Sequence, residues 1–298
     1  MCGIVGLLIK NPAWRDRLGE LMVPMLVGMT ERGPDSAGLA VFTDSVPASE
    51  RKYSLYAGAD DFNWTVLADD FLAQHARKPQ LAVQNNHAVL VTDLPPPTVR
   101  RWLQEQYPQL HLLSVGRSID LYKEVGSPRA VAARYNFKSL QGSHVVAHTR
   151  MATESAVTPA HAHPFTAGED FCLVHNGSLS NPYEVRRMLE PHGIHFDTDN
   201  DTEAACRYLE WRLREGDDLE SALRKGMLEL DGFYTFLMGT GNKLALLRDP
   251  FGCKPAVVAE CADYVAIASE FRSLAHLPDV NNARIYEPAP QEMYVWTA

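Results

Sequence analysis

The stretch MCGIVGLLI, residues 1–9, is the most informative local signal for the fold. Its apolar run is broken at Lys10, Asn11 and Pro12. No basic segment precedes it, and it is too short to cross a bilayer, which needs about 20 apolar residues. Its β-branched and glycine content is typical of a buried strand. We therefore expect a β-strand here, not a signal peptide or a membrane span.

Outward from this strand, strand-like and helix-like patterns are segregated along the chain. That segregation favours layered sheets with helices packed outside over a doubly wound parallel sheet. A β–α–β order between about residues 60 and 140 predicts a small α/β insert. The predicted strands are 4–9, 39–42, 87–92, 110–115, 144–149, 171–174, 233–238, 243–247, 256–259, 264–268 and 293–296, and the predicted helices are 18–29, 98–106, 127–135, 181–192, 202–213 and 219–230.

The composition is that of an ordinary globular protein, with 46% hydrophobic residues among 298. Lys and Arg number 28 against 37 Asp and Glu, a formal net charge of -9. Because nucleic acids are held mainly by basic residues, this balance argues against a nucleic acid as the main ligand. The five cysteines match no metal-ligand spacing and are too few to staple a chain of this size. A cytoplasmic protein is therefore expected.

Cys2 is notable for its position directly after the initiator Met1. Removal of Met1 would give Cys2 a free α-amine, whose pKa of about 7.7–8.0 lets it accept the thiol proton near neutral pH. The alternative is an inert cysteine on a buried strand, since free cysteines are commonly buried. Position alone leaves both interpretations open.

Three further segments carry residue types suited to an α-amino acid. Arg150, at the end of a predicted strand, could bind a carboxylate through two parallel hydrogen bonds, or could form a surface ion pair. Asn176 and Gly177, at a predicted strand exit, could form an oxyanion hole, or a simple Asn–Gly turn. Asp201 could bind an ammonium group, or only stabilise the start of a helix. Together with Cys2 these residues describe a site that binds an α-amino acid and attacks the carbonyl carbon of its side chain.

Seven motifs in chain order carry a family resemblance. They are MCGIVG (1–6), ERGPDSAGLAVF (31–42), HTRMAT (148–153), VHNGSLSN (174–181), DNDTE (199–203), RDPFGCKP (248–255) and ASE (268–270). In this order they resemble the class II, N-terminal cysteine glutamine amidotransferases, members of the N-terminal nucleophile hydrolases.

The resemblance implies an α+β fold, a four-layer αββα sandwich of two mainly antiparallel sheets between helical layers. One amidotransferase domain would span residues 2–298, interrupted by the insert of about 60–140. It also implies that Cys2 is the nucleophile with its own amine as the base. Asn176 and Gly177 would form the oxyanion hole.

For glutamine, the resemblance implies that Arg150 binds the α-carboxylate and Asp201 the α-ammonium, with Thr153 lining the pocket. Arg32 would be structural or gating. His161 and His163 could suggest a metal pair, but the family shares an Ala-His-Pro here, which favours packing of the turn. No metal is expected.

The insert segment at 114–123 (SVGRSIDLYK), followed by Gly126-Ser127-Pro128, resembles the glutaminase subunit of archaeal-type glutamate synthases and, more closely, of N-methylglutamate synthase. This resemblance implies that no cofactor resides in this chain and that separate synthase subunits with flavin and an iron–sulfur cluster use the ammonia in a hetero-oligomer. Two alternatives stay open: an amidase for another γ-glutamyl or small amide, and an inactive regulatory subunit.

Overall fold

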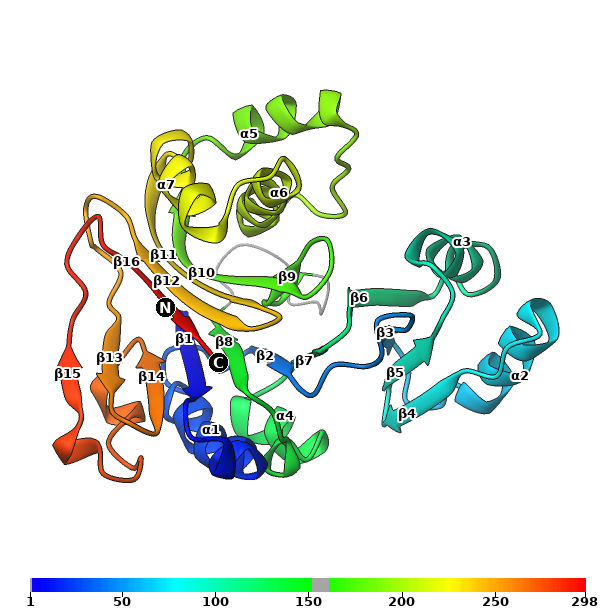
Figure 1. The fold of residues 1–298 in the computed structure, drawn as a ribbon, viewed down its shortest axis with the longest axis horizontal. Helices are drawn as coiled ribbons and strands as arrows, with labels where there is room; N and C mark the ends of the chain where they lie inside the picture. The colour runs from blue at the N-terminus through cyan, green and yellow to red at the C-terminus, as the bar shows by residue number, and fades with distance from the viewer. Residues whose placement is uncertain (1, 152–160) are drawn as a thin grey trace.

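The computed structural model describes residues 2–151 and 161–298, and every strand pair in it is antiparallel (Figure 1). A seven-stranded sheet has the spatial order β15 (Arg284–Tyr286), β13 (Val257–Glu260), β14 (Tyr264–Ala268), β1 (Gly3–Ile9), β8 (His144–Arg150), β2 (Ser36–Phe42) and β7 (Ile119–Val125). A five-stranded sheet has the order β16 (Met293–Thr297), β12 (Lys243–Arg248), β11 (Gly232–Thr240), β10 (Phe171–Leu179) and β9 (Phe165–Thr166).

Strand β1 is central in the seven-stranded sheet and is covered on both faces, which explains its uninterrupted apolar sequence. Ile4 and Leu8 belong to the core between the two sheets. Val5, Leu7 and Ile9 belong to the core on the opposite face. The first residues of the chain are therefore fixed deep inside the molecule.

Helices cover the outer face of each sheet (Figure 1). Below the seven-stranded sheet lie α1 (Leu18–Gly28) and α4 (Pro128–Arg134). Above the five-stranded sheet lie α5 (Pro182–Leu189), α6 (Asp201–Arg214) and α7 (Leu219–Glu229). The predicted α+β sandwich of antiparallel sheets between helical layers is confirmed. No helix among the described residues is long and apolar enough to span a membrane.

A separate four-stranded sheet projects from the side of this sandwich (Figure 1). Its order is β4 (Gln80–Gln84), β5 (His87–Thr92), β3 (Arg51–Ala57) and β6 (Leu110–Gly116), and α2 (Trp64–His75) and α3 (Pro96–Gln106) pack on it. We call these residues, 51–116, the side sheet. Strand β7 and helix α4, which the sequence analysis grouped with the insert, belong to the main sandwich because β7 pairs with β2 and α4 packs beneath it.

One carboxylate joins the side sheet to the sandwich. The turn between β6 and β7 wraps around Asp170, which accepts hydrogen bonds from the backbone N–H groups of Arg117, Ser118 and Ile119 at 2.8–3.0 Å. A Cβ atom added to Gly116 would lie 2.2 Å from Asp170 Oδ1, so glycine is required at this close approach. The Val-Gly-Arg-Ser part of the insert motif is thus explained by this joint.

Candidate active site

The backbone carbonyl of Cys2 is hydrogen-bonded to a residue of the opposite sheet. Cys2 directly precedes β1 of the seven-stranded sheet, and its thiol is free. Its carbonyl oxygen accepts a hydrogen bond from Asn176 Nδ2 at 3.4 Å, and Asn176 belongs to β10 of the five-stranded sheet. Two residues 174 positions apart are therefore brought together by sheet stacking.

Arg32 anchors the same carbonyl from the loop before β2. Its Nε donates to Cys2 O at 3.0 Å, and its Nη1 donates to Glu270 Oε1 at 2.8 Å. Hydrogen bonding from Arg32, with the nearby charge of Arg272, lowers the pKa of Glu270 and keeps it ionised. Arg32 was predicted to be structural or gating, and Glu270 was not among the predicted site residues. Both hold the backbone that carries Cys2.

Arg150 ends β8, the strand beside β1. The register pairs Gly3 with Thr149, so Arg150 lies opposite Cys2 across the sheet. Its side chain is 7% exposed, and Nη1 donates to the carbonyl of His161 at 3.4 Å. Because Arg150 is buried, the alternative prediction that it forms an exposed surface ion pair is wrong.

Asn176 and Gly177 lie inside β10, not at its exit. The prediction of a strand end near Val174 is wrong, because β11 continues to pair with β10 as far as Leu179. The alternative of an Asn–Gly turn is excluded by the same pairing. Gly177 has φ +145°, and a Cβ atom there would lie 2.1 Å from the carbonyl oxygen of Phe233. Only glycine fits this position.

Asp201 is the first residue of α6, and its side chain faces β10. The capping role belongs to Asn200, whose side chain accepts a hydrogen bond from Thr202 N at 2.8 Å. Asp201 Oδ2 instead accepts from Leu179 N at 2.9 Å, and Oδ1 lies 3.7 Å from His175 Nδ1. The sixth candidate, Thr153, lies outside the described residues.

Three buried imidazoles connect these candidates to one another, and the sequence analysis missed the connection. His163 Nδ1 lies 3.2 Å from His148 Nδ1, and His163 Nε2 lies 2.7 Å from Thr202 Oγ1. Thr202 Oγ1 is also 3.0 Å from His175 Nδ1. His148 is two residues before Arg150, His175 directly precedes Asn176, and Thr202 directly follows Asp201. Three of the family motifs contain one of these residues each, but the sequence does not show that the residues contact one another, because that contact depends on the tertiary fold.

These imidazoles are neutral at physiological pH. Burial lowers the pKa of His148 to about 3 and that of His163 well below its ordinary value. Burial also lowers the pKa of His175, although the Asp201 carboxylate opposes the shift. Neutral rings can each donate and accept one hydrogen bond, which suits them to a chain of contacts and not to ionic binding.

The suggested metal pair at His161 and His163 is not assembled. His163 is committed to His148 and Thr202, while His161 Nε2 lies 3.5 Å from Asp199 Oδ1 near the surface. Over residues 2–151 and 161–298, no three His, Cys, Asp or Glu side chains are placed to hold a metal ion. The His163–Pro164 peptide is cis.

Comparison with known proteins identifies relatives of this chain. A family model described as a glutamine amidotransferase domain matches residues 148–276. The chain is 46% identical to the glutamine amidotransferase-like protein GlxB of Rhizobium meliloti over 99% of this chain and 98% of that protein. It is 29% identical to an amidophosphoribosyltransferase of Methanocaldococcus jannaschii, over 59% of this chain and 38% of that protein.

Among solved structures, the glutamine phosphoribosylpyrophosphate amidotransferase of B. subtilis matches 99% of this chain with a TM-score of 0.60 and 19% identity. The match covers 47% of that chain, so the present chain spans about half its length. This likeness supports the fold, and the close relative supports the family. The chain belongs to the glutamine amidotransferase family of enzymes and has the fold of the phosphoribosylpyrophosphate amidotransferase.

Proposed function

We propose that this protein is a glutaminase that hydrolyses glutamine to glutamate and ammonia through a thioester on Cys2. Removal of Met1 frees the α-amine of Cys2, which takes the thiol proton. The thiolate attacks the side-chain amide carbon, and the resulting oxyanion is stabilised by Asn176 Nδ2 and the Gly177 N–H. The protonated amine supplies the proton with which ammonia leaves. Water then cleaves the thioester, giving glutamate and restoring the thiol.

In this proposal Arg150 binds the α-carboxylate of glutamine and Asp201 its α-ammonium, and Thr153 lines the pocket. The buried position of Arg150 opposite Cys2 supports the first assignment, because a bidentate ion pair is stronger away from water. The side chain of Asp201 is 26% exposed and already faces the strand that carries Asn176, which supports the second.

The observation that carries the proposal is the convergence of Asn176 and Arg32 on the Cys2 carbonyl. Arg32 fixes the backbone of Cys2 at 3.0 Å, and the Asn176 amide lies 3.4 Å from the same oxygen. A donor at this position is within reach of an oxyanion formed next to the thiol. An inert strand cysteine needs neither partner.

Cys2→Ala should abolish glutamate release from glutamine, because the variant lacks the proposed nucleophile. Mass spectrometry of the intact protein should show a chain that begins at residue 2. After denaturation in the presence of glutamine, trapped protein should carry an added glutamyl group on Cys2. Full activity of the Cys2→Ala variant would contradict the proposal and favour a non-catalytic role for this chain.

The Asp201→Asn variant tests whether the substrate is free glutamine or another amide. Loss of a charged partner for the α-ammonium should raise KM for glutamine about 10- to 100-fold. Hydrolysis of a glutamine analogue without the α-amine should change little. Equal effects on both compounds would indicate a substrate other than free glutamine.

We infer further that the ammonia passes to separate synthase subunits of a cytoplasmic hetero-oligomer, in which a partner carries the flavin and iron–sulfur cluster. The support is the motif resemblance at residues 114–123 to the glutaminase subunit of N-methylglutamate synthase. Affinity purification of the tagged chain from its native host tests this inference. A co-purified subunit with flavin and iron–sulfur absorption would support it; an active glutaminase isolated without any partner would contradict it.

A further inference from the structure

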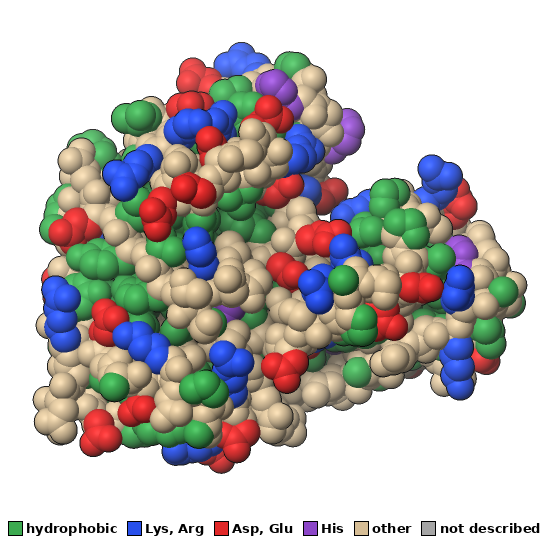
Figure 2. Space-filling view, in the orientation of Figure 1, with side chains coloured by type: hydrophobic (Ala, Val, Ile, Leu, Met, Phe, Trp, Pro, Cys, Tyr) green, Lys and Arg blue, Asp and Glu red, His purple; other side chains and the backbone are tan. Residues whose placement is uncertain are grey.

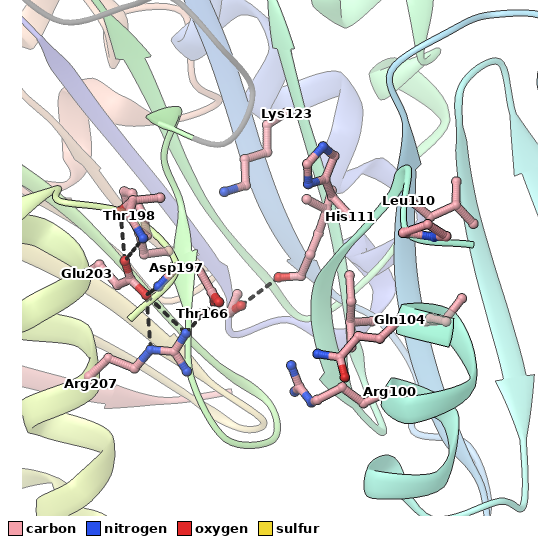
Figure 3. Close-up of a pocket in the computed structure, with 15 residues that line it drawn as sticks. Arg100, Gln104, Leu110, His111, Lys123, Thr166, Asp197, Thr198, Glu203 and Arg207 are labelled. Atoms are coloured by element: carbon pink, nitrogen blue, oxygen red, sulfur yellow. Dashed lines mark hydrogen bonds and ion pairs between the residues drawn. The ribbon is translucent and has the colours of Figure 1, made fainter. Parts of the chain in front are cut away.

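A cleft of about 400 Å³ lies between the upper helical layer and the side sheet (Figures 2 and 3). Figure 2 shows the molecule notched between these two parts. Among the described residues, none of those proposed for the reaction lines this cleft. Its polar lining includes Arg100, His111, Lys123, Thr166, Glu203 and Arg207. The volume is in the range of small-molecule sites, about 300–1,000 Å³.

Lys123 is a buried cation at this cleft, on strand β7. Its residue is 6% exposed, and Nζ donates one hydrogen bond, to the carbonyl of Ala162 at 3.0 Å. The ammonium also lies 5.0 Å from the centroid of the Phe165 ring. An ammonium group has three donors, and no carboxylate in the described part of the chain forms an ion pair with this one. A buried charge without a counter-ion is destabilising.

The other buried lysine of this region is paired in the ordinary way. Lys52 is 8% exposed, and its Nζ donates to Asp120 Oδ2 at 3.0 Å and to Thr43 Oγ1 at 2.6 Å. The two buried lysines therefore differ in their surroundings: Lys52 is paired with a carboxylate, whereas Lys123 lines the cleft. Burial lowers the pKa of Lys123 to about 8, so the amine is still mostly protonated at neutral pH.

The remaining charges of the cleft leave a second cation unpaired. Arg207 is neutralised by Glu203 at 3.0 Å and Asp197 at 2.8 Å. Arg100, on α3, forms no ion pair within residues 2–151 and 161–298, and Figure 3 shows it across the cleft from Arg207. Within the described residues, Lys123 and the exposed Arg100 are therefore the two cations of the cleft that have no ion-pair partner.

We propose that this cleft binds a small organic anion that carries carboxylate or phosphate groups, held by Lys123 and Arg100. The proposal does not rest on the glutaminase reaction. The two walls of the cleft are held in place by the hydrogen bonds of Asp170, which join the side sheet to the sandwich. Glu203 connects the site to the start of α6, because it accepts hydrogen bonds from Asp197 N at 2.9 Å and Thr198 N at 2.8 Å.

Isothermal titration calorimetry of the full chain with inorganic phosphate and with succinate, at constant ionic strength, tests the proposal. We expect saturable binding of at least one probe, and the probe that binds gives the ligand class. Lys123→Met and Arg100→Ala should each weaken binding about 10- to 100-fold, as expected for loss of a charged hydrogen bond. Arg101→Ala is the matched control, because Arg101 is exposed on the same helix outside the cleft and should bind as the unmodified protein does.

Two further measurements keep the binding site distinct from the active site and from a purely structural Lys123. Binding should persist in Cys2→Ala and Asp201→Asn; loss of binding in either would place the anion in the active site and overturn the proposal. Lys123→Met should be at least as stable to heat as the unmodified protein without anion, since an unpaired buried charge is removed. Destabilisation by Lys123→Met, absence of saturable binding, or binding that survives both cleft variants would each overturn it.

Discussion

At the scale of single residues, Arg32 holds the backbone of Cys2 in place through a hydrogen bond to its carbonyl oxygen. Its guanidinium joins two parts of the chain, the Cys2 carbonyl and the Glu270 carboxylate, with two different nitrogens. The planar, branched arrangement of donors makes this possible, and a lysine ammonium cannot reproduce it. Cys2 has no strand pairing of its own, since β1 begins at Gly3. The hydrogen bond from Arg32 therefore takes the place of a strand-pairing hydrogen bond at the Cys2 carbonyl.

Arg32→Lys should lower kcat for glutamine hydrolysis about 10- to 100-fold with a smaller change in KM, because a misplaced nucleophile affects the chemical step more than binding. Steady-state kinetics of the folded variant would measure the two constants separately. Arg272→Lys is the control, because Arg272 also contacts Glu270 but makes no contact with Cys2. A rise in KM alone would contradict the positioning role.

At the scale of elements, β8, β10 and the start of α6 are held together by Thr202 and the three buried imidazoles. The Thr202 hydroxyl oxygen lies within hydrogen-bond distance of two imidazole nitrogens and is also 3.4 Å from Asp201 Oδ1. Thr202 is 1% exposed, and the three histidines are also buried. Because water cannot replace a lost partner here, removing the hydroxyl leaves polar nitrogens unsatisfied.

Thr202→Val, which keeps the side-chain shape, should lower the free energy of unfolding by about 1–3 kcal/mol. It should also raise KM for glutamine, because Asp201 precedes Thr202 at the start of α6. Urea unfolding and steady-state kinetics measure the two effects. Thr202→Ser retains the hydroxyl and should restore both. An unchanged Val variant together with a destabilised Ser variant would show that the methyl group, not the hydroxyl, matters.

The same elements show what the sequence could and could not predict. Strands with strong apolar patterns, such as β1 and β8, were located within one residue, because burial on both faces imposes that pattern. Strands β3, β4 and β7 were not predicted. Strand β4 is a short and mostly exposed edge strand, and β3 and β7 interleave charged or polar residues with buried apolar ones. The imidazole contacts were also missed, since no local pattern encodes a distance between β8 and α6.

At the scale of the whole molecule, the layered fold was predictable because segregated strands and helices allow few other packings. The attachment of the side sheet was not, because it depends on Asp170, more than 50 residues away from the turn that it fills. The layers also bury a set of imidazoles on which the stability of the protein depends at low pH. Burial lowers the pKa of His87 to about 3 and that of His144 to about 4, and His148, His163 and His175 shift in the same direction.

These lowered pKa values predict an acid-sensitive fold. In the unfolded chain the imidazoles bind protons near pH 6.5, whereas the folded chain binds them only at lower pH. Unfolding therefore takes up protons below pH 6.5, and the free energy of unfolding falls by about 1.4 kcal/mol per pH unit for each such histidine. For His144 the loss runs from about pH 6.5 down to about pH 4. Above pH 6.5 the imidazoles are neutral in both states and contribute no pH dependence.

His144→Asn tests this account away from the active site. His144 Nε2 donates to the carbonyl of Thr240 at 2.8 Å, and the ring stacks on Phe42, so the variant will be less stable at every pH. The diagnostic quantity is therefore the slope. Urea unfolding at intervals from pH 8 to 4.5 should show parallel curves for the variant and the unmodified protein above pH 7. Below pH 6 the variant should lose stability less steeply, by about 1.4 kcal/mol per pH unit. Equal slopes below pH 6 would mean that His144 takes up its proton in the folded state as readily as in the unfolded chain, and that its burial does not make the fold acid-sensitive.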